Sequence, residues 1–404
     1  MAINPSHHEI PPTAGLPLTW QNWRRPWRRS LAQRAAAFLG TPAVQLECSG
    51  TACLVLALTQ LSRLSARKTV IIPAYTCPLV AIAVAHCGLK PRLCDLTPGH
   101  FDLDYAMLAS LCDHDTLAIV PTHLGGRVAD VAAALACARR VGAWVIEDAA
   151  QALGARSQGQ SLGLLGDMGF FSLAVGKGLT IFEGGLMVAR DAALRDELRR
   201  LSTAMIRFSP RWELQRTLQL LGYTACYRPE ILHYVYGLPL RRALRAGDPV
   251  RAVGDEFELA IPLHRVGAWR MSVGAYAWDR LPGWLADNAT RAKRRLARLR
   301  EIAGITVFED GADDEGVWPF LMLLLPDQQA RDVVLAQLWS AGLGVSRPFI
   351  HALPDYDYLS SLVPADPMPQ ARDFAARSLT LSNSPWLSDG QFEHICQVLQ
   401  RHVR

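Results

Sequence analysis

The 404-residue sequence has no closely paired cysteines, and this absence argues against two kinds of protein. Its nine cysteines include no C-x-x-C pair, and several lie inside apolar runs that we expect to be buried. Disulfide scaffolds and zinc-binding modules space their cysteines in recognisable pairs. We therefore expect reduced cysteines within the core, and the sequence suggests no metal site.

Long apolar runs and a leader-like start are also missing. No apolar run approaches the roughly 18 residues that a membrane-spanning helix needs. Residues 1–12 are polar and contain proline, unlike the apolar core of a secretory leader. We expect a cytoplasmic protein.

Charge is scarce for a protein that would bind nucleic acid. Only 20% of the residues are charged, and the net charge is +5. Arginine supplies nearly all of the positive charge, in part through groups at residues 24–29 and 293–295, which we interpret as solvated faces, with phosphate or a membrane surface as the alternative. Half of the residues are hydrophobic, which favours a globular, enzyme-like protein of two domains.

Short β-rich runs alternate with helical patterns in the first half of the chain. We expect strands at residues 43–47, 69–73, 92–95, 116–121, 143–147, 169–173 and 185–189. Most are separated by expected helices at residues 52–64, 79–86, 105–111 and 128–141. The alternation predicts an α/β fold with a mostly parallel sheet flanked by helices. Such sheets bind their ligands beyond the carboxyl ends of the strands.

The chain divides into three parts by pattern. Residues 1–42 would form an N-terminal arm and a helix. Residues 43–272 would form the large domain, in which an apolar and basic lobe at about 209–262 interrupts the alternation. Residues 273–404 would form a smaller C-terminal α+β domain, with helices and one strand expected at 273–302, 318–325, 327–341 and 388–403.

Two residues offer the chemistry of a cofactor that forms an imine. Lys177 lies in a short segment with Ser172 and several glycines, and Asp148 lies 29 residues upstream. Pyridoxal 5′-phosphate needs a lysine as covalent anchor and proton carrier, and a carboxylate that keeps its pyridine nitrogen protonated. Taken singly, the two residues are better explained as a surface lysine and a helix-capping aspartate. Their surroundings favour the cofactor.

A phosphate site is suggested by the segment that follows the first strand. The backbone N–H groups of Gly50, Thr51 and Ala52 would open a helix and point at an anion. Ser49 and Ser172 could add hydroxyl groups. An ordinary helix cap explains this segment about as well.

Three more residues fall near strand ends, where one site could collect them. The ring of Tyr75 could stack on a flat heterocycle, although packing is the more common role of such an aromatic residue. Gln151 could contact the ring oxygen of the cofactor, and His123 follows another strand.

These motifs together resemble, in order and spacing, the DegT/DnrJ/EryC1/StrS aminotransferases. Members of this family are fold-type I pyridoxal phosphate enzymes that usually aminate nucleotide-linked keto-sugars. The matching motifs lie at residues 49–52, 73–76, 94–96, 121–126, 147–151, 171–173 with Lys177, and 183–185. The resemblance is strong from about residue 43 to residue 190 and looser beyond.

The resemblance implies a role for each candidate residue. Lys177 and Asp148 would be the catalytic pair. The other contacts to the cofactor would come from Gly50, Thr51, Ala52, Tyr75, Gln151 and Ser172. Arg270 would reach the site from a second subunit, because the family builds its active site across a homodimer. The chain departs from the family at Ala268, where an asparagine usually contacts the partner's cofactor phosphate, and in the long lobe at 209–262.

Lysine at position 177 indicates transamination rather than sugar dehydration, since the dehydrating branch of the family carries histidine there. By resemblance, the amino donor would be glutamate and the carbonyl acceptor a nucleotide-linked keto-sugar. Three basic residues could bind its phosphates, namely Arg207, Arg211 and Arg347. In the C-terminal domain, the candidates for contact with the substrate are Arg347, Pro348, His351 and Tyr356.

Other functions stay open at this point. The lobe mixes apolar residues with arginines, as a membrane-surface element would, so the acceptor could be a lipid-linked or other non-sugar carbonyl compound. A lid or an added dimer interface is the interpretation of the lobe that we favour. A protein of this kind could also bind pyridoxal phosphate as a regulator or sensor, without turnover, or catalyse aldol cleavage or desulfuration on the same fold.

Overall fold

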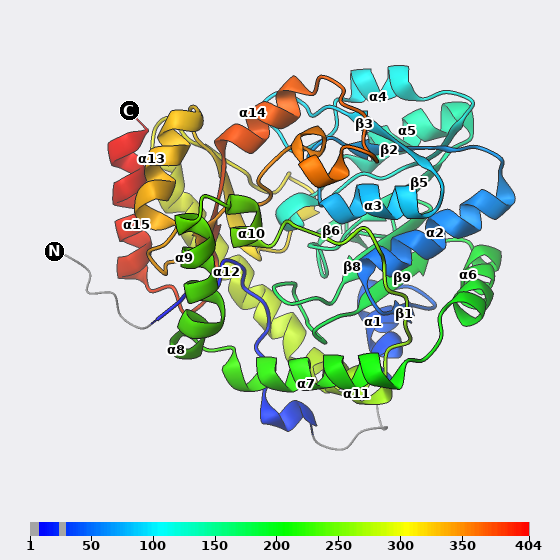
Figure 1. Ribbon diagram of the computed structural model, residues 1–404, viewed down its shortest axis with the longest axis horizontal. Helices are drawn as coiled ribbons and strands as arrows, with labels where there is room; N and C mark the ends of the chain where they lie inside the picture. The colour runs from blue at the N-terminus through cyan, green and yellow to red at the C-terminus, as the bar shows by residue number, and fades with distance from the viewer. Residues whose placement is uncertain (1–7, 24–29, 404) are drawn as a thin grey trace.

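The computed structural model describes residues 8–23 and 30–403. It has a large half built on one sheet with helices around it, and a smaller half built on a second sheet (Figure 1). Residues 1–7 and 24–29 of the predicted arm, including its basic group, lie outside the described residues.

The sheet of the large half has seven strands in the order β1-β9-β8-β5-β4-β2-β3. They are β1 (Gln45–Glu47), β2 (Thr69–Pro73), β3 (Lys90–Cys94), β4 (Thr116–Ile119), β5 (Trp144–Asp148), β8 (Met168–Ser172) and β9 (Gly185–Ala189). Strands β2, β3, β4, β5 and β8 pair in parallel, whereas β9 is antiparallel to β1 and β8. All seven predicted strands are present, with ends that differ by at most two residues. The mostly parallel α/β fold is confirmed.

Helices cover both faces of this sheet, which explains the apolar strand patterns. They include α1 (Leu31–Leu39), α2 (Gly50–Leu64), α3 (Pro78–His86), α4 (Tyr105–Leu111), α5 (Val131–Val141) and α6 (Ala192–Met205). Within β2, Val70 and Ile72 pack in one core cluster with α2 and α3, and Ile71 packs in another with α4 and α5. Successive residues of a strand point to opposite faces, so a strand covered on both sides is apolar throughout.

The smaller half carries a four-stranded antiparallel sheet in the order β10-β12-β14-β13. Its strands and helices are β10 (Thr306–Val307), β12 (Phe320–Leu324), β13 (Val345–Ser346), β14 (Ser378–Ser382), α12 (Leu281–Arg300), α13 (Gln328–Leu338), α14 (Pro369–Arg377) and α15 (Asp389–His402). The predicted helix at 273–302 is divided, because α11 (Ala268–Ala277) ends before α12 begins with Pro282 in its first turn. Proline is favoured in a first turn and disfavoured in a helix interior.

A third, small sheet was not predicted from the sequence. The hairpin of β6 (Arg156–Ser157) and β7 (Gln160–Ser161) pairs with β11 (Asp314–Glu315), so a segment of the first half of the chain meets one of the second. Two-residue strands are too short to show an alternating pattern. Only the packing of distant segments forms them.

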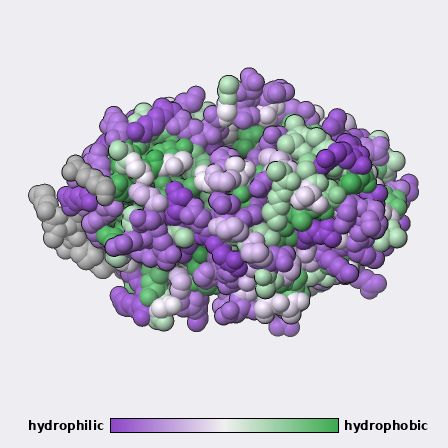
Figure 2. All heavy atoms as spheres, turned by 90° about the horizontal axis from the view of Figure 1, so that it is seen from above, coloured by the Kyte–Doolittle hydropathy of each residue, from purple (hydrophilic) through white to green (hydrophobic). Residues whose placement is uncertain are grey.

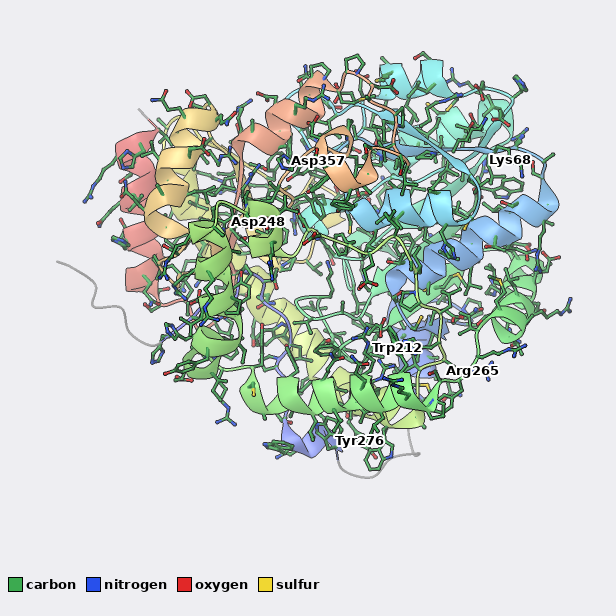
Figure 3. All side chains as sticks on the ribbon, in the orientation of Figure 1. Lys68, Trp212, Asp248, Arg265, Tyr276 and Asp357 are labelled. Carbon is green, nitrogen blue, oxygen red and sulfur yellow. The ribbon has the colours of Figure 1, made fainter. Side chains whose placement is uncertain are left out.

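The lobe at 209–262 is helical. It contains α7 (Pro210–Cys226), α8 (Pro229–Leu232), a π-helical turn (His233–Gly237), α9 (Leu238–Arg245) and α10 (Pro249–Val253). In Figure 1, α7 runs along the lower edge of the molecule, and α8, α9 and α10 rise between the two halves. Trp212 extends from α7 toward the body of the protein (Figure 3), whereas Leu214, Leu218 and Leu221 are exposed.

The described part of the N-terminal arm ties these parts together. The Glu9 carboxylate pairs with Arg241 of the lobe at 2.6 Å. The Ile10 N–H donates to the Gly342 carbonyl of the smaller half at 2.9 Å, and the Leu16 N–H donates to the Gly178 carbonyl at 3.0 Å. The arm therefore runs from the lobe, past the smaller half, to the segment that carries Lys177.

The distribution of hydrophobic side chains can be followed on one face of the molecule (Figure 2). On the face seen in Figure 2, hydrophilic side chains predominate and hydrophobic ones gather in scattered patches. Within residues 8–23 and 30–403, no helix has both the length and the apolar character to cross a bilayer. The cytoplasmic location and the domain boundaries near residues 42 and 272 stay predictions.

Candidate active site

A cavity of about 450 Å³ lies at the carboxyl ends of the parallel strands. Thr76 follows β2, Thr122 follows β4, Asp148 ends β5 and Ser172 ends β8, and all four line this cavity. Parallel strands end at the same edge of their sheet, so residues far apart in the sequence meet there. Lys177 lines the same cavity.

Asp148, which is buried, and Lys177 supply a carboxylate and an amine to this cavity. The Asp148 carboxylate accepts the Ala150 N–H at 3.0 Å. Burial raises the pKa of Asp148, and the Ala150 N–H and the nearby Lys177 oppose this shift. Burial lowers the pKa of Lys177, and Cys77 and Asp148 oppose that shift. A lowered pKa favours the neutral amine, which is the form that attacks a carbonyl carbon.

The segment carrying Lys177 is held by the N-terminal arm. Gly176 has a φ of +82°, a conformation that glycine adopts without strain. A Cβ atom on Gly176 would lie 2.5 Å from the Thr13 hydroxyl oxygen. Pro12 and Thr13 also line the cavity. The arm thus packs directly on this turn and closes one side of the site.

The amino end of α2 presents backbone N–H groups to the cavity, and we call this helix start the cradle. Ser49 caps the helix by accepting the Ala52 N–H at 2.9 Å. The N–H groups of Gly50 and Thr51 have no hydrogen-bond partner among the described residues, and both residues line the cavity. A Cβ atom on Gly50 would lie 3.5 Å from the Cβ atom of Ser172 and would narrow the cradle. Free N–H groups at a helix start attract phosphate.

The glycines that follow Glu183 keep this cradle in place. A Cβ atom on Gly185 would lie 2.2 Å from the Ser49 carbonyl oxygen. Any larger residue at this first position of β9 would displace Ser49 and the start of α2. Close packing against Ser49 therefore explains why the second glycine of the Glu-Gly-Gly motif has no side chain.

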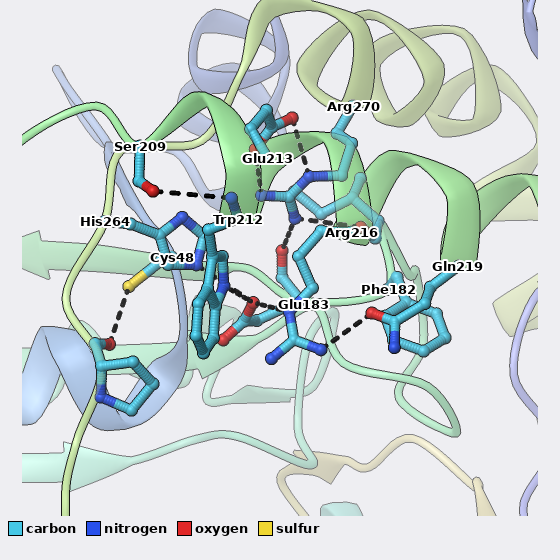
Figure 4. A network of polar contacts seen from close by, with 12 residues as sticks. Cys48, Phe182, Glu183, Ser209, Trp212, Glu213, Arg216, Gln219, His264 and Arg270 are labelled. Atoms are coloured by element: carbon cyan, nitrogen blue, oxygen red, sulfur yellow. Dashed lines mark hydrogen bonds and ion pairs between the residues drawn. The ribbon is translucent and has the colours of Figure 1, made fainter.

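Glu183 itself joins the cradle to the lobe (Figure 4). Its carboxylate accepts hydrogen bonds from Trp212 Nε1 at 3.2 Å and Arg216 Nε at 2.5 Å, both on α7, and lies 3.1 Å from His264 Nε2. Burial would raise the pKa of Glu183, but His264 and Arg216 outweigh it, so the pKa is lowered. An ionised Glu183 thus anchors the lobe to the segment behind the cradle.

Gln151 and His123 also line the cavity. The Gln151 side-chain oxygen accepts the Gly125 N–H at 2.7 Å, which leaves its amide NH₂ for a ligand. His123 Nδ1 accepts the Ala129 N–H at 3.1 Å, so the proton of a neutral ring sits on Nε2, 3.0 Å from the Glu147 carboxylate.

Two predicted cofactor contacts are not brought to the cavity. Tyr75 is buried, its ring packs on Phe349 and Phe374, and its hydroxyl donates to the Phe349 carbonyl at 3.0 Å. A ring held in this aromatic cluster has no free face for a cofactor. The Ala52 N–H is used by Ser49, and Ala52 does not line the cavity.

Arg270 is not where the resemblance implies. Its side chain is wholly buried in its own chain, and its Nε and Nη2 donate to the Glu213 carboxylate at 2.9 and 2.6 Å. Its Nη1 donates to the carbonyls of Ile181 and Glu183. Charge pairing holds Arg270 under the lobe, so it offers no guanidinium surface to a second subunit.

The lobe supplies cavity residues that the sequence did not predict. They are Tyr236, Val253, Gly254, Asp255 and Phe257. Cys77, after β2, is another unpredicted lining residue. No motif marks these positions, because the lobe reaches the cavity through its tertiary packing. Of the predicted substrate contacts, Arg347 and Pro348 line the cavity, whereas Arg207, Arg211, His351 and Tyr356 do not.

Asp255 fastens the lobe to the smaller half. Its Oδ2 accepts the Ile350 N–H and the Tyr356 hydroxyl, each at 2.8 Å. Burial raises the pKa of Asp255 to about 6, against the opposing effects of these two hydrogen bonds. The contact joins the lobe to the smaller half at the cavity, which Asp255 lines.

This raised pKa predicts a pH-dependent effect of Asp255→Asn. An acid whose folded-state pKa exceeds its unfolded value of about 3.9 binds its proton more tightly when folded. Its stabilisation is therefore complete below pH 4 and is lost as the pH rises through about 6. Asparagine stays neutral and keeps the acceptor oxygen, so we expect the variant to be more stable at pH 7 by on the order of 2 kcal/mol. Thermal unfolding of both proteins at pH 4 and pH 7 checks this, and an equal difference at both values would contradict it.

Comparison with known proteins agrees with this geometry. The chain resembles a solved putative sugar aminotransferase from Streptococcus pneumoniae in its pyridoxamine phosphate form, with a TM-score of 0.76 and 19% identity over 98% of this chain and 99% of the other. At that identity, the likeness concerns the fold.

Two curated relatives match part of the sequence. GDP-perosamine synthase of Caulobacter vibrioides is 40% identical over 153 residues, which are 38% of this chain and 41% of that protein. L-glutamine:scyllo-inosose aminotransferase of Streptomyces griseus is 35% identical over 209 residues, which are 50% of this chain and 49% of that protein. The match thus spans less than half the length of either relative.

A family model matches a stretch that includes cavity residues of the large half. It covers residues 20–224, which is more than half of the 404 residues. Lys177, Asp148 and the cradle at the start of α2 all fall within it. The chain belongs to the DegT/DnrJ/EryC1/StrS aminotransferase family.

Proposed function

We propose that this protein is a pyridoxal phosphate-dependent aminotransferase. One observation carries the proposal: Lys177, Asp148 and the free N–H groups at the start of α2 line a single cavity. The groups match the three ends of the cofactor, which are an aldehyde, a pyridine nitrogen and a phosphate. The space beside Gly50, which a Cβ atom would narrow, fits the phosphate end.

Each residue has a distinct task in this proposal. Gly50, Thr51 and Ser172 hold the phosphate, and the Gln151 amide meets the ring oxygen. The cofactor, when bound, supplies an electron sink for the carbanion at the donor's α-carbon. Asp148 holds a proton on the pyridine nitrogen. Lys177 Nζ takes the α-proton of the donor and delivers it within the same site.

The arm and the lobe would keep water out of the site while the proton moves. Thr13 packs on the Lys177 turn, and Asp255 holds the lobe against the smaller half. This arrangement supports the interpretation of the lobe as a lid. It gives no support to a membrane role, although the outer leucines of α7 remain exposed.

For the substrates, we propose glutamate as donor and a keto-sugar as acceptor. The relation to GDP-perosamine synthase supports a nucleotide-linked sugar. The relation to an aminotransferase of scyllo-inosose, a cyclic ketone without a nucleotide, supports a cyclitol as the second candidate. Only one of the three arginines proposed for phosphate contact, Arg347, lines the cavity, which favours a compact acceptor.

We also propose a homodimer. The exposed apolar row of Leu214, Leu218 and Leu221 on α7 lies beside α11, whose Trp269 is 46% exposed. A second copy could bury this row. The buried Arg270–Glu213 pair means that such a dimer would not use Arg270 to complete the neighbouring site.

Addition of glutamate to the pyridoxal phosphate-loaded protein tests the function. We expect the violet-edge absorbance of the lysine-bound cofactor to fall as the amine form appears and 2-oxoglutarate is released. Adding 2-oxoglutarate should reverse the change, and D-glutamate serves as the control. A stable spectrum with glutamate, glutamine and other amino donors would favour the regulator, which binds the cofactor without turnover.

A further inference from the structure

Two hydroxyl groups at the cavity come from segments that the family match does not include. Thr13 lies in the N-terminal arm and Tyr236 in the lobe, and both residues line the cavity with Lys177. The family model covers residues 20–224, so both positions lie outside it. Neither side-chain hydroxyl has a hydrogen-bond partner among the described residues. The steps that we propose at the cofactor use neither of them.

The backbone on either side of Thr13 is fixed. The Pro11 carbonyl accepts the Ser382 hydroxyl at 2.6 Å. The Ala14 N–H donates to the Pro319 carbonyl, also at 2.6 Å. These bonds hold the arm against the end of β14 and the residue before β12, so the Thr13 side chain has a defined position at the cavity.

Tyr236 is positioned by a π-helical turn of the lobe, His233–Gly237. Such a turn contains one more residue than an α-helical turn and is frequent at functional sites. A Cβ atom on Gly237 would collide with the Glu9 carboxylate, which pairs with Arg241 at 2.6 Å. The turn is thereby fixed against the arm, which can be followed in Figure 1 as the dark blue segment beside α8 and α9.

The two hydroxyl groups carry no charge, and this limits the ligand that they can bind. Burial raises the pKa of Tyr236, and Glu9 adds to this effect against Arg241, so the phenol keeps its proton. A hydroxyl both donates and accepts hydrogen bonds, which suits the alcohol groups of a ligand. A phosphate or a carboxylate is bound best by a cation. The cross-strand neighbours Ser346 and Thr380 also line the cavity and bring two more hydroxyls.

We propose that Thr13 and Tyr236 bind ring hydroxyl groups of the carbonyl acceptor and thereby select a cyclic polyhydroxy ketone. The inference rests on the proposed aminotransferase function and deepens it. A site built to bond a hydroxyl group rejects an analogue that lacks it, because the polar groups of the site are then left unpaired. The arm and the lobe would thus determine specificity, while the strand ends hold the groups that move the proton.

The acceptor half-reaction tests the proposal with scyllo-inosose as the probe. Protein loaded with pyridoxamine phosphate is mixed with this ketone, and the violet-edge absorbance reports the return of the cofactor to its lysine-bound form. We expect the half-saturating concentration of scyllo-inosose to rise by about 3- to 10-fold in Tyr236→Phe and in Thr13→Val, as for the loss of one hydrogen bond. The reaction with 2-oxoglutarate, a ketone without hydroxyl groups, should change by less than about 2-fold.

Calorimetric titration with scyllo-inositol gives a second measurement that needs no turnover. This polyol has the ring hydroxyls but no carbonyl, so it binds without reacting. Each variant should weaken its binding by the same factor of about 3 to 10. Tyr105→Phe removes a tyrosine hydroxyl on α4, outside the cavity, and should leave both measurements unchanged.

Three results would overturn the proposal. They are unchanged scyllo-inosose saturation in both variants, an equal loss with 2-oxoglutarate, which would indicate general damage to the cavity, and a wild-type protein that neither binds scyllo-inositol nor converts scyllo-inosose. If the wild-type protein reacted with no amino donor but still bound scyllo-inositol through Thr13 and Tyr236, the aminotransferase function would fall and the hydroxyl site would stand. The two failures are therefore distinguishable.

Discussion

Replacement of Lys177 with alanine is expected to abolish transamination and to remove the violet-edge absorbance of the loaded protein. Lys177 Nζ is the one amine that lines the cavity within the described residues. Without it, the cofactor has no covalent anchor and the donor's α-proton has no acceptor. General acid–base catalysis contributes about 10²- to 10⁴-fold, so turnover should fall by at least this factor. Absorbance spectra and glutamate half-reactions measure both effects.

The matched control is Lys90→Ala, which removes an exposed lysine at the start of β3. It should bind the cofactor and react as the wild type does. Because Lys177 follows a tight turn that the arm covers, thermal unfolding should accompany the spectra to show that Lys177→Ala is folded. An unchanged violet absorbance in folded Lys177→Ala would rule out Lys177 as the anchor.

Replacement of Asp148 with alanine is expected to abolish turnover while some cofactor remains bound. The phosphate cradle and Lys177 are intact in this variant, so binding weakens without being lost. The pyridine nitrogen loses the carboxylate that keeps it protonated, and the electron sink fails. We expect a loss of at least about 10³-fold in the glutamate half-reaction, a typical cost of removing a central electrostatic group.

Asp148→Asn separates charge from shape. Asparagine can still accept the Ala150 N–H that the carboxylate accepts at 3.0 Å, so the strand end should be preserved. If the charge matters, Asp148→Asn should be nearly as inactive as Asp148→Ala but more stable. Wild-type rates in Asp148→Asn would mean that the pyridine nitrogen needs no ionised partner here. The raised pKa of Asp148 gives a further check, because a bound pyridinium ion should lower it.

The arrangement of the lobe bears on which acceptor the proposed aminotransferase could bind. Tyr236, Asp255 and Phe257 come from the lobe, and they close a cavity whose other walls come from both halves. A buried ion pair and the Glu183 network attach α7 to the rest of the chain. Residues of the lobe and of both halves thus line the same cavity, which is the arrangement that our proposal of a lid requires.

Local pattern accounts for the seven-stranded sheet and for the centre of the site. A strand covered by helices on both faces must be apolar throughout, so β2, β4 and β9 can be recognised without knowledge of their neighbours. The edge of a parallel sheet also gathers strand ends by necessity. For that reason, the order of strands along the chain is enough to place Lys177, Asp148, Ser172 and Gln151 in one site.

Tertiary packing alone decided the rest. A sequence does not show which face of Tyr75 is free, and the structure buries its ring against Phe349 and Phe374. It does not show that Arg270 finds Glu213, 57 residues earlier in the chain. The approach of Asp255 and Arg347 to the cavity likewise depends on contacts between segments nearly a hundred residues apart. The sequence by itself predicted the chemistry, because the motifs at the strand ends are local and resemble those of a known family. The cavity walls that we propose select the substrate form only once distant segments have packed together.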